Sequence, residues 1–132
     1  MTDRIEFVTQ IDISRYMEST EAVSGFGALA QETRLSALRL LVRSEPQGLA
    51  AGVLARQLNV PQNTLSAHLS VLANAGLIGS TRDGRSVIYR AKLEQVHALV
   101  LHLLRDCCNG RPELCGPLAD DLVKTCSSAE CC

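Results

Sequence analysis

The feature that most constrains this chain is a short helical pattern that runs into a strong turn signal. Three leucines share one narrow side of a helix at about 100° per residue. They are Leu65, Leu69 and Leu72. Two extended runs follow and meet at Asp83-Gly84. Asp-Gly favours a two-residue hairpin turn, because that turn needs positive φ. Residues 61–89 are therefore predicted to form a helix followed directly by a β-hairpin.

The opposite side of the predicted helix is small and polar, and it carries no acidic residue. Such a side suits a DNA major groove, because amides can bond base edges in two places and Ala can contact a thymine methyl. The residues predicted to contact DNA from this helix are Gln62, Asn63, Thr64, Ser66, Ala67 and His68. His68 lies at the flank of the helix, so a bond to phosphate or a structural bond is expected rather than base readout.

Two arginines, Arg82 and Arg85, flank the tip of the predicted hairpin. A helix followed by a hairpin with cationic tips is the winged helix-turn-helix pattern, in which the helix reads bases and the wing holds phosphate. The predicted fold class is therefore mainly α with a small β-hairpin wing. The predicted partner is double-stranded operator DNA.

Several motifs occur in the order found in one known family. They are Ala28–Leu35, Asn63–Leu69, Leu72, Ala75–Leu77 and the Gly84-Arg85…Tyr89 pattern. Together they resemble the arsenic-repressor (ArsR/SmtB) family of bacterial metalloregulators, over roughly residues 22–105. The resemblance implies a winged helix-turn-helix regulator that responds to a metal or metalloid.

Composition is consistent with one small domain rich in helices. The chain has 132 residues, and with 3% aromatic residues its core must consist of Leu, Val, Ile and Ala. No apolar run approaches the ~18 residues that a membrane span needs. The first residues show no signal-peptide pattern. We expect a cytoplasmic protein that does not associate with membranes.

Charge is distributed unevenly along the chain, although the net charge is only −1. Residues 22–92 contain eight Arg or Lys and three acidic residues, which gives +5, whereas residues 1–21 and 93–132 each carry −3. The basic part coincides with the elements predicted to bind DNA, as nucleic-acid binding requires. The alternative explanation is a chance imbalance on a solvated surface.

The pattern divides the chain into three parts. Residues 1–20 are expected to be an N-terminal extension, residues 21–106 a winged helix-turn-helix domain for DNA binding and dimerisation, and residues 107–132 a cysteine-rich, metalloid-binding segment and tail. Within the domain, helices are expected at about residues 20–30, 33–44, 49–58, 62–74 and 93–107, with a tight turn over 59–62.

The last predicted helix carries a wide apolar stripe. The stripe consists of Leu93, Val96, Leu99, Val100, Leu103 and Leu104. It is too wide for a helix at the edge of so small a domain, so we expect a homodimer through the terminal helices. A two-fold dimer matches a palindromic operator with half-sites one helical turn apart. The alternative is that the first helix covers the stripe within the monomer.

All six cysteines lie beyond residue 106. Structural disulfides are rare in the cytosol, so this clustering indicates a shared metal or redox task. Cys107 and Cys108 end the last helix, and the chain from there to Cys115 is long enough to fold back. Three thiolates select a soft ion; trivalent arsenic prefers three sulfurs, whereas zinc needs a fourth ligand. We predict that these three cysteines bind As(III) or Sb(III).

The family resemblance bears on this site in two ways. Many arsenic repressors carry Cys-Val-Cys in the helix before the recognition helix, but the corresponding residues 49–54 contain no cysteine. A subset instead places a Cys-Cys pair and a later Cys at the end of the last helix, which the arrangement here resembles. The zinc-sensing subset uses acidic and His ligands on that helix. Here His97 and His102 point about 140° apart and form a poor chelating pair.

The expected function is an arsenite- or antimonite-responsive repressor that binds operator DNA as a dimer and is released by As(III). An alternative keeps the DNA-binding frame but has the cysteines sense Cd or Zn, or oxidation or reactive sulfur. A thiol enzyme is disfavoured, because Cys107 and Cys108 lie at a predicted helix C-terminus, where the dipole raises the pKa of a thiol. We therefore expect no enzymatic activity.

Overall fold

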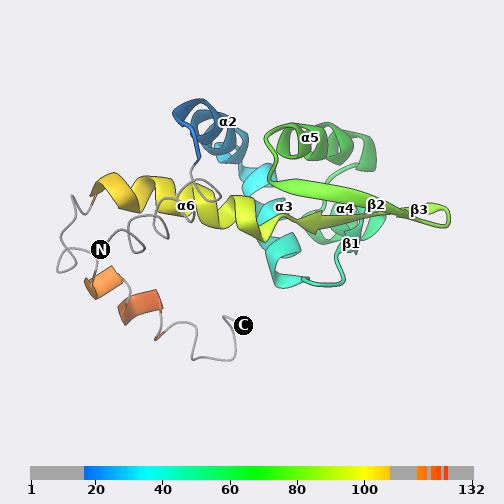
Figure 1. Ribbon diagram of the computed structural model, residues 1–132. Helices are drawn as coiled ribbons and strands as arrows, with labels where there is room; N and C mark the ends of the chain where they lie inside the picture. The colour runs from blue at the N-terminus through cyan, green and yellow to red at the C-terminus, as the bar shows by residue number, and fades with distance from the viewer. Residues whose placement is uncertain (1–16, 108–115, 119, 123, 125–132) are drawn as a thin grey trace, which may run out of the picture. The chain divides into compact units, whose positions relative to one another are not determined.

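The computed structural model describes residues 17–107, 116–118, 120–122 and 124 (Figure 1). The chain divides into two compact units, residues 1–99 and 100–132. In the second unit, residues 100–107 complete the last long helix, and the described residues from Gly116 onward are helical. No helix in the described ranges is long and apolar enough to cross a membrane.

The described elements are mainly helices, with one small sheet. In chain order they are α2 (Ser19–Leu29), α3 (Glu32–Arg43), β1 (Leu49–Ala50), α4 (Ala51–Leu58), α5 (Gln62–Asn74), β2 (Ile78–Asp83), β3 (Ser86–Ala91) and α6 (Leu93–Cys107). The prediction of a mainly α fold with a β-hairpin wing is confirmed. The helices predicted from periodicity start and end within about two residues of those in the structure.

A core of aliphatic side chains orients α5. Leu65, Leu69 and Leu72 are fully buried, as their spacing predicted. They belong to one apolar cluster with Leu41 of α3 and Leu54 of α4. Because one side of α5 is buried, the side opposite to it faces away from the core.

The end of α5 is closed by a glycine. Gly76 has φ +80°, its amide donates to the carbonyl of Ala73 at 3.0 Å, and the amide of Leu77 donates to the carbonyl of Leu72 at 3.1 Å. This pair of bonds is a Schellman ending, which satisfies the last carbonyls of the helix and reverses the chain. It leads α5 directly into β2, whose first residue, Ile78, is buried.

The sheet is antiparallel, with strand order β1-β3-β2. The pairing of β2 with β3 ends at Asp83↔Ser86, so the two loop residues are Gly84 and Arg85. The turn predicted at Asp83-Gly84 was therefore wrong by one residue. Gly84 has φ +63° at the first loop position, which is where a type II′ hairpin needs glycine.

The strand β1 is a further difference from the sequence prediction, which placed residues 49–58 in one helix. Leu49 pairs with Tyr89 and Ala50 with Ile88, and α4 starts only at Ala51. A strand of only two residues, Leu49 and Ala50, is too short to show a strand pattern in the sequence. They are extended because β3 offers them backbone partners.

An ion pair also holds the base of the hairpin. Arg90 donates from Nη2 to Oε2 of Glu45 at 2.7 Å, and so joins β3 to the segment after α3. This hydrogen bond, together with the negative charge of Glu45, raises the pKa of the Arg90 guanidinium. The pair is partly exposed, so it positions the wing more than it stabilises the fold.

The first half of α6 packs against α2. Leu99 is 3% exposed, and its Cδ1 lies 3.0 Å from the position that a Cβ on Gly25 would take. Leu93 and Val96 are partly buried against the core. The alternative expectation, that the first helix covers the stripe, therefore holds for Leu99. In the second unit, Val100 and Leu103 are 47% and 56% exposed.

Two glycines of α2 provide a test of this packing. We expect Gly25→Val to lower the free energy of unfolding by about 1–3 kcal/mol more than Gly27→Val, because only the first inserts methyl groups against Leu99. A Cβ on Gly27 meets no atom within 4 Å. Both substitutions carry the same helix-propensity term. Urea denaturation followed by circular dichroism measures the difference, and equal unfolding free energies would contradict the packing.

Candidate nucleic-acid interface

The helices α4 and α5 are joined by the tight turn predicted over residues 59–62. Asn59 ends α4 in the left-handed conformation, at φ 56° and ψ 46°, which asparagine tolerates. The amide of Val60 then donates to the carbonyl of Ala55 at 3.1 Å. Pro61 precedes the first turn of α5 with φ −60°, which proline favours. The two helices and this turn form a helix-turn-helix.

The exposed side of α5 carries most of the residues predicted to contact DNA. The exposed ones are Gln62, Asn63, Thr64, Ser66 and Ala67. The first turn of α5 contains no acidic residue. The positive end of the helix dipole is therefore not neutralised by a side chain of that turn, which favours a nearby phosphate.

Hydrogen bonds within α5 define what these side chains can offer a base. The hydroxyl of Ser66 donates to the carbonyl of Gln62 at 2.9 Å, and that of Ser70 to the carbonyl of Ser66 at 3.1 Å. Asn63 Oδ1 accepts the amide of Thr64 at 2.9 Å. Ser66 thus keeps lone pairs that can accept, and Asn63 keeps two amide donors.

His68 differs from the other predicted contact residues because it is half-buried. Its Nδ1 lies 3.3 Å from Nη1 of Arg34, which belongs to α3. The sequence placed His68 at the flank of the helix, and the structure shows a side chain there that already has a partner inside the protein.

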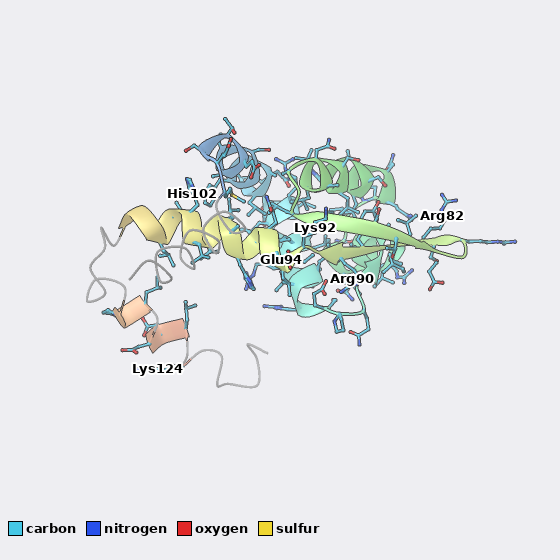
Figure 2. All side chains as sticks on the ribbon, viewed as in Figure 1. Arg82, Arg90, Lys92, Glu94, His102 and Lys124 are labelled. Atoms are coloured by element: carbon cyan, nitrogen blue, oxygen red, sulfur yellow. The ribbon has the colours of Figure 1, made fainter. Side chains whose placement is uncertain are left out.

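The hairpin places both predicted wing arginines in solvent. Arg85 is the second loop residue, and Arg82 lies in β2 opposite Val87. α5 packs against β2 and α4 against β3, and the distal end of the hairpin projects beyond both helices (Figure 1). Figure 2 shows Arg82 near that distal end and Arg90 nearer the base.

A hollow of about 360 Å³ separates the start of α5 from the wing. Its lining includes Arg56 of α4, Gln62 of α5 and Arg85 of the loop. Arg56 is exposed and also lines a neighbouring hollow of about 580 Å³ beside the turn. The sequence prediction did not include Arg56. Counting every exposed cation in the helix-turn-helix would have found it.

The electrostatics of this region favour a polyanion. Residues 46–92 contain five Arg or Lys and a single acidic residue, Asp83, which gives a net charge of +4. Arg90 is paired with Glu45. Arg56, Arg82 and Arg85 lie on the elements around the exposed side of α5, where each is able to neutralise one phosphate.

The predicted metalloid site falls largely outside the described residues. Cys107 is the last residue of α6, and Cys108 and Cys115 lie in the undescribed range 108–115. Within the described ranges, no group of three or more His, Cys, Asp or Glu could hold a metal ion. The three-cysteine site therefore stays a prediction. The predicted N-terminal extension lies outside the described residues up to residue 16.

Known proteins with a similar sequence and fold show the family to which the chain belongs. A family model described as a helix-turn-helix domain matches residues 29–80. The transcriptional activator HlyU of Vibrio cholerae is 34% identical over 88 residues, covering 65% of this chain and 79% of that protein. The nodulation protein NolR of Rhizobium meliloti is 33% identical over 97 residues, covering 73% of this chain and 77% of that protein.

A solved structure agrees with these relatives. An ArsR-like transcriptional regulator from Rhodococcus sp. RHA1 superposes with a TM-score of 0.62 at 31% identity, covering 74% of this chain and 89% of that chain. The chain belongs to the ArsR family of winged helix-turn-helix regulators. Proteins of this family are transcription regulators with a DNA-binding fold, not enzymes.

For an ArsR-family chain, the salt dependence of DNA affinity can test the arginines around the hollow. We expect Arg56→Ala and Arg85→Ala each to reduce the slope of log affinity against log salt by about 1, because each removes one phosphate contact. Arg39→Ala, from the exposed surface of α3, is the matched control and should keep the wild-type slope. The measurement is fluorescence anisotropy of a labelled duplex across a salt series. An unchanged slope for Arg56→Ala would remove it from the interface.

Proposed function

We propose that this ArsR-family chain is a cytoplasmic repressor that binds operator DNA as a homodimer and is released when As(III) or Sb(III) binds Cys107, Cys108 and Cys115. The observation that carries the DNA-binding part is the exposed, acid-free side of α5 between two arginine-bearing elements. Base-reading groups lie on the helix and cations lie on the wing and on α4. In DNA recognition, contacts with base edges determine sequence specificity, and contacts with phosphates position the protein on the duplex.

Base readout is assigned to the exposed side chains of α5. Gln62 and Asn63 stand at its first two positions, where a recognition helix contacts base edges. Asn63 has its amide donors available and Ser66 has acceptor lone pairs available. Ala67 offers a methyl group for thymine. The wing residues Arg82 and Arg85 take phosphate.

The homodimer is assigned to the terminal helices because apolar side chains remain exposed there. Val23 on α2 is 71% exposed in the first unit, and Val100 and Leu103 on α6 are 47% and 56% exposed in the second. On α6, Val100 and Leu103 belong to the apolar stripe that the sequence predicted, and burial of such a stripe against a partner is favourable. A second copy of the chain is the simplest partner, since a two-fold axis also pairs the recognition helices.

The inducer assignment rests on the chemistry of the donor set and on its place in the chain. Three thiols within residues 107–115 suit a soft ion that takes three sulfurs. The helix α6 ends at Cys107 and begins at Leu93, two residues after the wing strand β3 ends. Ligand binding at one end of α6 can therefore bias the DNA-binding elements at the other. A coupling of about 1–3 kcal/mol weakens DNA binding 5–150-fold.

A titration of reduced protein bound to a labelled duplex tests this proposal. The duplex is first selected from a random pool, and Ser66→Glu, which places a negative charge against DNA, should not bind it. We expect arsenite and antimonite to lower affinity within the 5–150-fold range. Each of Cys107→Ser, Cys108→Ser and Cys115→Ser should abolish this release, whereas the matched Cys126→Ser should keep it.

The other outcomes of the titration assign the cysteines differently. Release by zinc or cadmium would make the chain a sensor of thiophilic metals in general. If the protein leaves the DNA only on oxidation or on addition of reactive sulfur, and two of the three cysteines are enough for this release, the chain is a redox or sulfur sensor. Equal affinity with and without every ligand would reject an effector role for the cysteines.

The dimer is tested by sedimentation of the full chain. We expect a dimer at micromolar concentration and a shift toward monomer in Leu103→Glu, because a carboxylate at a buried apolar interface would be desolvated. Leu101 is also exposed on α6 but lies outside the apolar stripe, so Leu101→Glu is the matched control. Wild-type protein that sediments only as a monomer would contradict the proposal.

A further inference from the structure

The first turn of α3 holds an arginine in a defined position. Gln31 precedes α3, and its Oε1 accepts the amide of Arg34 at 2.8 Å. This bond fixes the start of the helix, and with it the direction in which the Arg34 side chain leaves the backbone. Arg34 is half-buried, so its guanidinium reaches neighbouring elements and not only solvent.

The first of these neighbours is the end of α2. Nε of Arg34 donates to the carbonyl oxygen of Ala28 at 2.6 Å. Ala28 lies in the last turn of α2, where carbonyls lack partners inside the helix. A cation there also complements the negative end of the helix dipole. Arg34 therefore joins the start of α3 to the end of α2.

The second neighbour is the recognition helix. Nη1 of Arg34 lies 3.3 Å from Nδ1 of His68. A guanidinium has only donors and stays protonated in proteins, so Nδ1 must be the acceptor in this pair. With Nδ1 as the acceptor, the N–H of the ring is on Nε2. One planar side chain thus bonds α2 through one nitrogen and α5 through another.

The other contacts of α5 with the core are not directional. They come from buried leucines, and apolar burial is non-directional. A helix held only by leucines can shift by a fraction of an ångström at little cost, whereas two directed hydrogen bonds from a rigid fork resist that shift. Base readout depends on such small displacements, because the bonds to base edges are directional.

We propose that Arg34 is a positioning residue for DNA recognition, which holds α5 in register through Nδ1 of His68, and that His68 acts through Arg34 and not on DNA. The proposal rests on the proposed DNA-binding function. Of the two roles that the sequence left open for His68, a bond to phosphate or a structural bond, the proposal selects the structural bond. Lysine cannot substitute for Arg34, because an ammonium is a point charge without the planar fork.

Two substitutions of His68 separate the two roles. Asparagine places an amide oxygen near the position of Nδ1, whereas glutamine places its amide near the position of Nε2. If Nδ1 matters, His68→Gln should lose about tenfold in affinity for the selected duplex, a typical effect of one bond to a charged group. His68→Asn should recover most of that loss. Arg34→Lys should lose as much as His68→Gln.

The opposite order would overturn the proposal. If His68→Gln binds more tightly than His68→Asn, the histidine uses Nε2, and the phosphate role is correct. Equal affinities of the two variants would also overturn it. A double-mutant cycle adds a further check, because Arg34→Lys combined with His68→Gln should cost little more than either change alone.

Hydrogen–deuterium exchange of the free full-length protein provides a readout without DNA. Arg34→Lys and His68→Gln should speed amide exchange in residues 62–74, and Arg34→Lys also in residues 25–30, relative to Arg39→Lys as the matched control. The same exchange rates in Arg34→Lys and Arg39→Lys would overturn the proposal. If the wild-type protein selects no duplex, the proposed function fails, and the exchange rates alone decide whether Arg34 positions α5.

Discussion

Burial of one side of α5 is the constraint on which the DNA-facing side depends. Leu65, Leu69 and Leu72 are fully buried against aliphatic side chains of α3 and α4, and the small polar residues opposite them are exposed. The hydrophobic effect fixes which side is buried but not the exact position along the core. Directional contacts complete the placement: the turn at Asn59 before α5, the Schellman ending at Gly76 after it, and the contact of Arg34 with His68 along it.

The sequence predicted those features that depend on residues close together in the chain. The side of α5 that is buried follows from the spacing of its leucines, and the hairpin follows from a glycine that needs positive φ. The loop register did not follow, because Gly84 can occupy either central position of a two-residue turn, and pairing of the whole strands decides between them. The strand β1 was missed for a similar reason, since Leu49 is extended only through its distant partner Tyr89.

The candidate site was predictable to a similar degree. Exposure of the α5 residues and of the wing arginines follows from sequence periodicity and from the hairpin. Arg56 and Arg34 were not foreseen as members of the site, because their importance lies in what other elements bring near them: a hollow beside the wing for one, and a carbonyl and an imidazole for the other. The cysteines show the opposite situation. Their clustering is a property of the sequence alone, and Cys108 and Cys115 lie outside the described residues.

The short strand β1 also leaves the distal half of the hairpin with open edges. It pairs with Ile88 and Tyr89 alone. Within the described sheet, Ser86 and Val87 therefore have no partner strand on that side, and β2 is an edge strand along its full length. Open edges invite strand pairing between molecules, and charged side chains on an edge prevent it. Arg82, Asp83 and Arg85 lie at this end of the hairpin. The two arginines suit the wing for phosphate, and together with Asp83 they also disfavour pairing of the free protein with other molecules through its open edges.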